Sequence, residues 1–185
     1  MWWARLLNVI SGLLAGGVAA STNSYESIAT VTVGSGGSST VTFSSIPSTY
    51  KHLQIRAMTM ASAGATTNGI TWINSDTTGT NYYTHNLTGN GSSAAAGAYN
   101  YPYTPFFGGG TSAPQGMVMD LLDYADTNKY KTLRILSGYD ANGSGNISLT
   151  SQLWKNTAAI TNVQFAVTSG NWAQYSSFAL YGIKG

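Results

Sequence analysis

The strongest constraint on the fold is an alternation of apolar and polar residues that begins near residue 24 and returns along most of the chain. In the run YESIATVTV at residues 25–33, every second side chain falls on the same side of an extended strand, and β-branched residues are abundant. Clusters of Gly, Ser, Asn, Asp and Pro bound such runs, as turns require. The pattern predicts regular strands at residues 25–33, 40–43, 52–61, 70–73, 116–124, 131–139, 147–154, 160–168 and 178–183.

Residues 76–115 differ, because Tyr and Phe stand there among Gly, Ser, Asn and Pro without a sustained period. A structureless loop of that length is unusual in a compact domain, so we expect irregular strands near residues 82–87 and 99–107. Many short strands with no helix between them favour antiparallel sheets. The sequence therefore predicts an all-β fold, an antiparallel β-sandwich of jelly-roll type.

Residues 1–20 (MWWARLLNVISGLLAGGVAA) form a separate apolar segment. Trp3, Leu6, Ile10 and Leu13 follow each other at intervals of three and four residues, which is the spacing of one helix face. We therefore predict a short N-terminal apolar helix over residues 1–20, followed by a β-sandwich domain over residues 21–185.

Three interpretations compete for this helix. A secretory signal peptide would have its basic start at Arg5 and small residues at 18–20. A transmembrane span needs about 20 mainly apolar residues, and Asn8, Ser11 and three glycines dilute this run. The third interpretation is a docking helix that partner chains bury. We favour docking, with the signal peptide second; the predicted anchoring residues are Trp2, Trp3, Leu6, Leu7, Val9, Ile10, Leu13 and Leu14.

Charge and cysteine content limit the classes of function that the protein can have. Only 8% of the residues are charged, against about 25% in ordinary soluble proteins. A net charge of +2 from 8 basic and 6 acidic residues provides little electrostatic attraction for nucleic acid. The absence of cysteine excludes disulfides, thiolate metal sites and Cys nucleophiles. Composition therefore disfavours an enzyme, and we expect no cofactor.

Two groups of residues could supply catalytic carboxylates or oxygen ligands for a metal, but each has a simpler structural explanation. Asp120, Asp123 and Asp126 offer the carboxylates of a glycosidase pair, but residues three apart on a strand face opposite sides. Residues 140–146 place Asp, Asn, Ser and Asn at alternate positions, as in a calcium loop. The bidentate Glu that such a loop needs is replaced by Ser151, and a hairpin turn accounts for the same residues. We therefore predict no catalytic and no metal-binding residue.

Aromatic residues on loops have two interpretations. Tyr and Trp rings stack on sugars, which indicates a glycan platform, but the same rings also fill cores and subunit interfaces. We favour the interface and leave glycan binding open. The candidates for sugar stacking are Tyr82, Tyr83, Tyr99, Tyr101, Tyr103, Trp172 and Tyr175.

The order of several motifs resembles a family of tailed-bacteriophage virion proteins. These motifs are SYESIATVTVGSGGSSTVTFSSIPSTYKHLQIR at residues 24–56, DTTGTNYYTHNLTGNGSS at 76–93, LDYADTNKYKTLR at 122–134, and the ending LWKNTAAITNVQF…FALYGIKG. The resemblance spans residues 24–185 and leaves out the N-terminal helix. It implies an oligomeric β-rich module displayed on a capsid or tail fibre, located in the virion, with no catalytic residues.

The expected function is that of a non-enzymatic virion structural protein, a capsid decoration or head-fibre protein anchored by its N-terminal helix. The alternative is a tail-fibre or receptor-binding module that recognises host surface glycans. The surface has too few charges to keep copies apart, so we expect a homo-oligomer, a trimer. We expect it to bind capsid or tail proteins, and we expect no nucleic acid partner and no membrane span. The expected subunit contact is Tyr99, Tyr101, Tyr103, Phe106 and Phe107.

Overall fold

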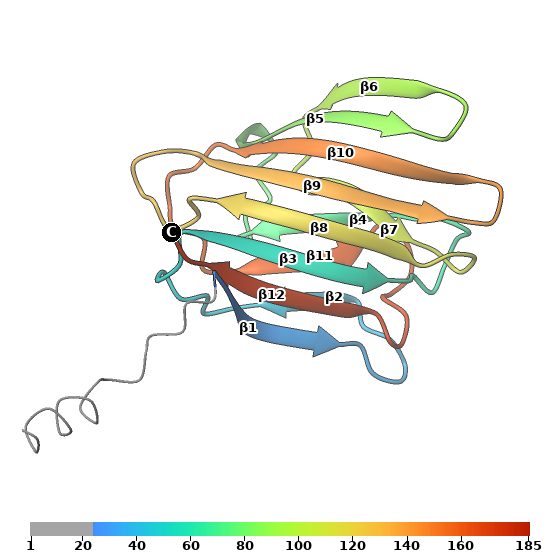
Figure 1. Cartoon of the computed structure of the whole chain (residues 1–185), viewed down its shortest axis with the longest axis horizontal. Coiled ribbons are helices and arrows are strands. Elements are labelled where there is room, and N and C mark those ends of the chain that lie inside the picture. Colours follow the sequence, from blue (N-terminus) through green and yellow to red (C-terminus); the bar gives the residue numbers. More distant parts are fainter. Residues whose placement is uncertain (1–23) are drawn as a thin grey trace, which may run out of the picture.

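Two antiparallel sheets pack face to face in the computed structural model, which describes residues 24–185 (Figure 1). The large sheet has the strand order β1 (Tyr25–Thr32), β12 (Ser177–Ile183), β3 (His52–Thr59), β8 (Gln115–Leu122), β9 (Lys131–Asp140), β10 (Gly145–Trp154), β5 (Tyr82–Gly89) and β6 (Ala94–Tyr99). The small sheet has the order β2 (Thr40–Phe43), β11 (Val163–Val167), β4 (Thr67–Ile73) and β7 (Thr104–Gly109). A 3₁₀ turn (Gly79–Asn81) precedes β5.

Most connections cross from one sheet to the other, and only β5–β6, β8–β9 and β9–β10 stay within the large sheet. Strands β1, β3, β8 and β12 lie next to one another in the large sheet, and β2, β4, β7 and β11 make up the small sheet. Two hairpins break this alternation, because β9–β10 and β5–β6 both extend the large sheet beyond β8. The β5–β6 hairpin therefore lies at the far edge of the large sheet (Figure 1).

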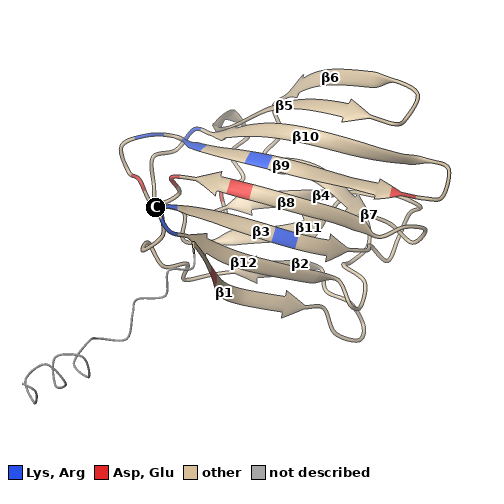
Figure 2. Cartoon of the chain, in the orientation of Figure 1, with Lys and Arg blue, Asp and Glu red and all other residues tan. Residues whose placement is uncertain are grey.

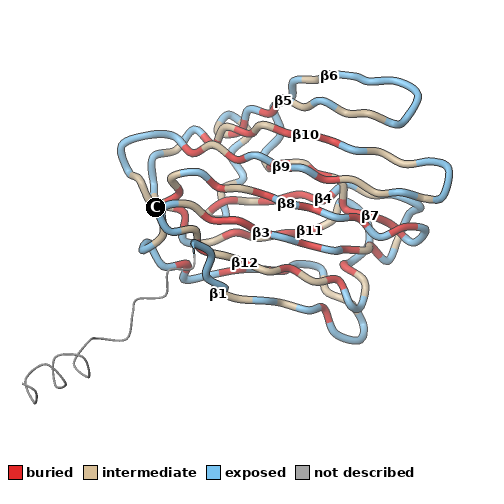
Figure 3. The backbone as a smooth tube through the Cα atoms, in the orientation of Figure 1, coloured by how far each residue is buried: buried red, intermediate tan, exposed pale blue. Residues whose placement is uncertain are grey.

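The core lies between the two sheets and is rich in aromatic rings. Phe165 of β11 meets Phe43 and Phe106 edge-on, with ring centroids 6.4 and 6.1 Å apart. Phe178 of β12 packs on Phe165 from the opposite sheet at 5.1 Å, and Trp172 meets Phe178 edge-on at 5.2 Å. Edge-on contacts of this kind stabilise a core beyond the area that they bury. Burial alternates along the strands (Figure 3).

The structure confirms the all-β prediction, the antiparallel sheets and all of the regular strands. The irregular strand expected at 99–107 is wrong in its bounds, because β6 ends at Tyr99 and β7 begins at Thr104. The run AAAGA at 94–98 had no strand signal, since β6 is an edge strand that pairs only with β5 and needs no buried face. The predicted N-terminal helix and its domain, residues 1–20, lie outside the described residues.

Candidate functional site

The outer face of the large sheet carries a row of aliphatic side chains. Leu87 of β5 pairs with Leu149 of β10, Leu149 with Leu136 of β9, and Leu136 with Val118 of β8. These side chains point away from the small sheet, and Leu149 and Leu136 are 54% and 48% exposed. Because directly opposed residues in antiparallel strands bring their side chains into contact, the row forms one continuous apolar ridge.

The next row along the sheet makes a hollow beside this ridge. Here Ile147 pairs with Gly138, Gly138 with Gly116, and Gly116 with Met58. The two glycines leave a shallow depression of about 720 Å³ between Ile147 and Met58. Together the two rows and their flanks form what we call the apolar outer face: Tyr25, Met58, Tyr83, Leu87, Val118, Leu122, Leu136, Ile147 and Leu149, all exposed.

In strand β10, aliphatic side chains face outward and polar side chains face inward, opposite to the usual arrangement. Its leucines and isoleucine lie on the exposed side, whereas Ser148, Thr150 and Gln152 point inward and are almost fully buried. Burying hydroxyl and amide groups while exposing aliphatic ones is unfavourable in a monomer. This inversion leaves aliphatic side chains of β10 exposed on the outer face of the large sheet.

Charges in the middle of the apolar outer face are few, and two of them are hydrogen-bonded to the same side chain, Gln54. Figure 2 shows them on β3, β8 and β9, namely Arg56, Asp120 and Arg134. Gln54 donates to Asp120 at 2.8 Å and accepts from Arg56 Nε at 2.7 Å. The Arg56 guanidinium also lies over the rings of Tyr25 and Tyr181, at 5.6 and 5.3 Å from their centroids. Gln54 thus connects Asp120 to Arg56 on the outer face of the sheet.

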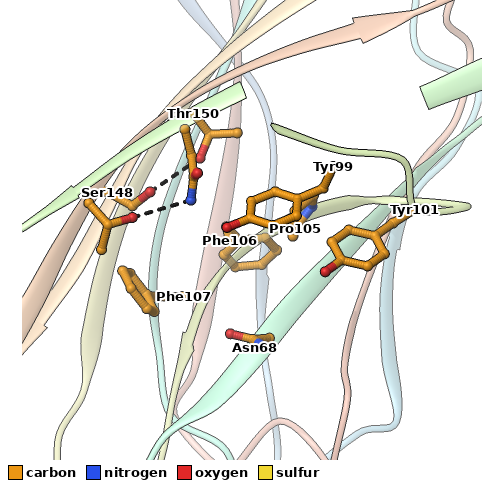
Figure 4. A pocket seen from close by; sticks show the side chains of 10 residues that line it. Asn68, Tyr99, Tyr101, Pro105, Phe106, Phe107, Ser148 and Thr150 are labelled. Carbon is orange, nitrogen blue, oxygen red and sulfur yellow. Dashed lines mark hydrogen bonds between the residues drawn. The ribbon is translucent and has the colours of Figure 1, made fainter. Parts of the chain in front are cut away.

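A second surface feature is a tyrosine-lined cleft at the edge of the sandwich. Tyr99 stacks on Tyr101 with centroids 5.5 Å apart and planes 15° apart, and Tyr101 stacks on Tyr103 at 5.3 Å and 7°. The cleft beside them holds about 310 Å³ (Figure 4). Its lining comes from β4, β5, β6, β7, β10 and the segment after β6: Asn68, Asn86, Thr88, Tyr99, Tyr101, Pro105, Phe106, Phe107, Ser148 and Thr150.

The other predicted aromatic candidates are dispersed. Tyr82 and Trp172 are buried in the core, Tyr83 lies on the apolar outer face, and Tyr175 is exposed on a loop. Among the expected subunit contacts, Phe106 is only 4% exposed and packs in the core of its own chain, so its ring is not available to a partner. Phe107 meets Tyr139 edge-on at 5.6 Å and lines the cleft.

The acids that follow β8 form a cluster with two lysines, one of them just before β3. Asp123 accepts from Lys129 at 2.5 Å and from Lys51 at 2.9 Å. The hydrogen bond from Lys129 and then that from Lys51 lower the pKa of Asp123 from 3.8 to about 2. Its backbone N–H donates to His52 Nδ1 at 2.9 Å. The two ammonium groups therefore keep the Asp123 carboxylate ionised.

Beneath this cluster lies Lys131, whose side chain is fully buried. Its ammonium group donates to the backbone carbonyls of Asp126, Lys129 and Thr157. Burial lowers the pKa of Lys131, and the nearby Asp126 opposes that change. Lys131 therefore joins the loop after β8 to the loop after β10.

Three further acids, Asp76, Asp126 and Asp140, also have hydrogen-bonding partners. Asp76 accepts from Trp154 Nε1 and Asn81 Nδ2, both at 2.8 Å, and these bonds outweigh burial to keep the pKa of Asp76 low. Asp126 accepts from the N–H of Asn128 at 2.8 Å, which is an Asx turn. Asp140 accepts from the N–H of Asn142 at 2.8 Å in the turn between β9 and β10, as the hairpin interpretation expects.

Within residues 24–185, no group of three or more His, Asp or Glu side chains is placed to hold a metal ion. That part of the chain also has no helix long and apolar enough to span a membrane. Comparison with models of protein families finds no match for the chain, and comparison with curated protein sequences finds none either. The apolar outer face and the tyrosine-lined cleft are therefore interpreted from their own chemistry. The predicted anchoring residues, Trp2 to Leu14, lie outside the described residues.

Proposed function

We propose that this protein is a non-enzymatic structural protein of a tailed-bacteriophage virion, a capsid decoration or head-fibre protein whose β-sandwich self-associates. The virion assignment is supported by the motif order at residues 24–185. The observation that carries the assembly is the apolar outer face, where aliphatic side chains of four neighbouring strands stand exposed in one row.

The finer fold assignment, a jelly roll, belongs to the same proposal. Its support is the way the chain alternates between the sheets. If the hairpins β5–β6 and β9–β10 are set aside, eight strands remain, in the sheet orders β1-β12-β3-β8 and β2-β11-β4-β7. Numbered one to eight along the chain, these are the orders 1-8-3-6 and 2-7-4-5, which two interleaved Greek keys produce. The hairpins then widen one sheet of the jelly roll.

The occupant that we assign to the apolar outer face is a second copy of the same chain. Soluble monomers rarely expose so large a set of contiguous aliphatic side chains. A net charge of +2 gives little repulsion between copies, and Asp120 and Arg134 sit opposite each other in neighbouring strands, so the charges of the face sum to a small value. We propose a homotrimer in which each subunit buries this face near the three-fold axis.

We propose the apolar outer face as the subunit contact in place of the tyrosine-rich segment 99–107 that the sequence suggested. Tyr99 and Tyr101 stack on each other beside the cleft, at the opposite edge of the sandwich from β1. The apolar outer face spans the middle of the large sheet and offers more aliphatic surface to a partner. Interfaces of permanent oligomers are enriched in such apolar surface at their centres.

Sedimentation of the full chain tests the assembly. We expect the wild type to sediment as a trimer at micromolar concentration. The double variant Leu136→Asp with Leu149→Asp should sediment as a monomer with an unchanged circular-dichroism spectrum, because both side chains are exposed within the subunit. The matched control, Tyr130→Asp with Tyr175→Asp, places two charges at exposed positions off this face and should stay trimeric. A monomeric wild type, or a double variant that keeps the wild-type mass, contradicts the assembly.

Labelling of particles tests the location. Antibodies to the exposed β9–β10 turn should decorate phage particles over the capsid or its head fibres. Label confined to the tail tip would favour the alternative, a receptor-binding module. Absence of the chain from purified particles would overturn the virion assignment, and turnover of a host polysaccharide that Asp120→Asn or Asp123→Asn abolishes would overturn the non-enzymatic one.

A further inference from the structure

We infer that the tyrosine-lined cleft between β5–β6 and β7 is a binding site for a neutral oligosaccharide, a property beyond the structural role proposed above. The cleft forms where the large sheet extends past the small one. There the inward side chains of β10 and β5 border the cleft, Ser148 and Thr150 being almost fully buried at its base, and β7 supplies the opposite wall through Pro105 and Phe107.

The polar groups of the cleft are uncharged and closely spaced. Ser148 and Thr150 of β10 lie with their hydroxyl oxygens 3.3 Å apart, and Asn86 Nδ2 donates to the Thr88 hydroxyl at 3.2 Å. Figure 4 shows Ser148 and Thr150 on one side of Tyr99, with Tyr101 on the other. Both bonds are long, so these groups retain hydrogen-bonding capacity for a ligand.

Two further groups strengthen the polar character of the cleft. Among residues 24–185, the Asn68 side chain makes no hydrogen bond, although it borders the cleft from β4 (Figure 4). The Asn86 carbonyl oxygen likewise accepts no hydrogen bond from the described residues. Amide groups both donate and accept, which suits the alternating donors and acceptors of sugar hydroxyls.

The tyrosine stack supplies the second half of a sugar site. Tyr99 and Tyr101 are 42% and 38% exposed, so their rings are not core residues. Each ring is nevertheless fixed by its neighbour in the stack. Because Tyr101 lies between Tyr99 and Tyr103, the stack offers a sugar its exposed ring edges and hydroxyl groups, and these fixed groups cost little entropy on binding.

Tyr99 has a further positional constraint within β6. Its ring folds back over Gly97, where a β-carbon would lie 2.2 Å from the Tyr99 hydroxyl oxygen. Only glycine at position 97 therefore lets the ring adopt this position beside Asn86, which pairs with Gly97 across the two strands. The arrangement of the stack depends on that glycine.

Charge and size define the ligand class. None of the ten lining residues is charged, so neither an anionic nor a cationic ligand finds a counter-charge here. A volume of about 310 Å³ lies at the lower end of small-molecule sites. Aromatic rings flanked by amides and hydroxyls favour a short neutral oligosaccharide over a proline-rich peptide, which would need fewer hydrogen bonds.

Titration of the full chain with neutral oligosaccharides tests the site. The probes are trisaccharides of glucose, galactose, mannose and rhamnose at millimolar concentration, with trigalacturonate as the anionic comparison and a proline-rich peptide as the competing class. Calorimetry should detect at least one neutral trisaccharide, and neither trigalacturonate nor the peptide. No binding by any neutral trisaccharide, or binding of the peptide alone, overturns the inference.

Variants then locate the binding. Tyr101→Ala and Asn86→Leu should each weaken binding at least tenfold, and Gly97→Ala should do so by displacing the Tyr99 ring without removing any lining side chain. Tyr175→Ala, which removes an exposed ring elsewhere, should leave the affinity unchanged. Unchanged thermal melting shows that each variant is folded. Binding that all three cleft variants retain places the ligand elsewhere and contradicts the site.

Discussion

Leu133 and Leu136 lie three residues apart on β9 and point to opposite faces of the large sheet. Leu133 is fully buried between the two sheets, whereas Leu136 stands on the apolar outer face between Leu149 and Val118. One strand thus contributes to the core of the subunit and to the surface assigned to its partner.

Alanine at these two positions should separate the two roles. Leu133→Ala should lower the free energy of unfolding by about 2–5 kcal/mol, because it leaves a cavity between the sheets. Leu136→Ala should cost less than about 1 kcal/mol within the subunit. In thermal melts over a range of protein concentrations, Leu133→Ala should lower the midpoint throughout. Leu136→Ala should mainly reduce its dependence on concentration, which reports association. Equal and concentration-independent effects would contradict the assignment of the outer face.

Lys131→Met should destabilise the protein by about 3 kcal/mol, although it keeps most of the side-chain volume. The substitution leaves three buried carbonyls, those of Asp126, Lys129 and Thr157, without their donor. Urea denaturation measures the loss. Lys155→Met is the control, because that side chain is exposed, and its effect should stay within about 0.5 kcal/mol. Similar values for both variants would show that the ammonium group of Lys131 does not hold the two loops.

The lowered pKa of Asp123 predicts a loss of stability in acid. Since the folded protein holds this pKa at about 2, below the ordinary 3.8, the ion pairs with Lys129 and Lys51 stabilise the fold above pH 3.8. That contribution should disappear as the pH falls from 3.8 towards 2. It amounts to about 1 kcal/mol after allowance for solvent screening, since both lysines are exposed. Unfolding free energies measured across this range should fall less steeply for Asp123→Asn. Parallel curves for the two proteins would contradict the ion-pair assignment.

Removal of residues 1–20 should leave the β-sandwich folded but unable to join the virion. Within residues 24–185, the two sheets enclose a hydrophobic core cluster that extends from Val33 to Leu180, and this cluster should support folding of the truncated chain. Each large apolar side chain buried at a partner contributes about 1.5–3 kcal/mol before association costs. Leu6→Asp with Ile10→Asp should have the same effect, and Arg5→Ala, the control, should matter little. Particle occupancy and thermal melting measure the two properties. Normal occupancy of the truncated chain would mean that attachment runs through the sandwich.

The sequence predicted the tyrosines of the cleft only as one set among several aromatic candidates. Tyr82 and Trp172 share the same composition signal and are core residues. Ser148 and Thr150 carried no signal at all, because Ser and Thr are abundant throughout the chain and every second residue of β10 is a plausible inward position. Their role became visible only when β7 and β10 were seen to border the same cleft.

The alternation of residues was sufficient to predict an all-β protein and the regular strands, because the pleat of a strand is a local property that adjacent residues determine. Which face of a strand is buried, and which strands are neighbours, depend on contacts between residues distant in the sequence. Leu87, Val118, Leu136 and Leu149 come from four strands and meet only because the sheet order is β8-β9-β10-β5. On β10, Ser148 and Thr150 point inward, where they are almost fully buried and border the cleft, and the aliphatic side of the strand faces outward.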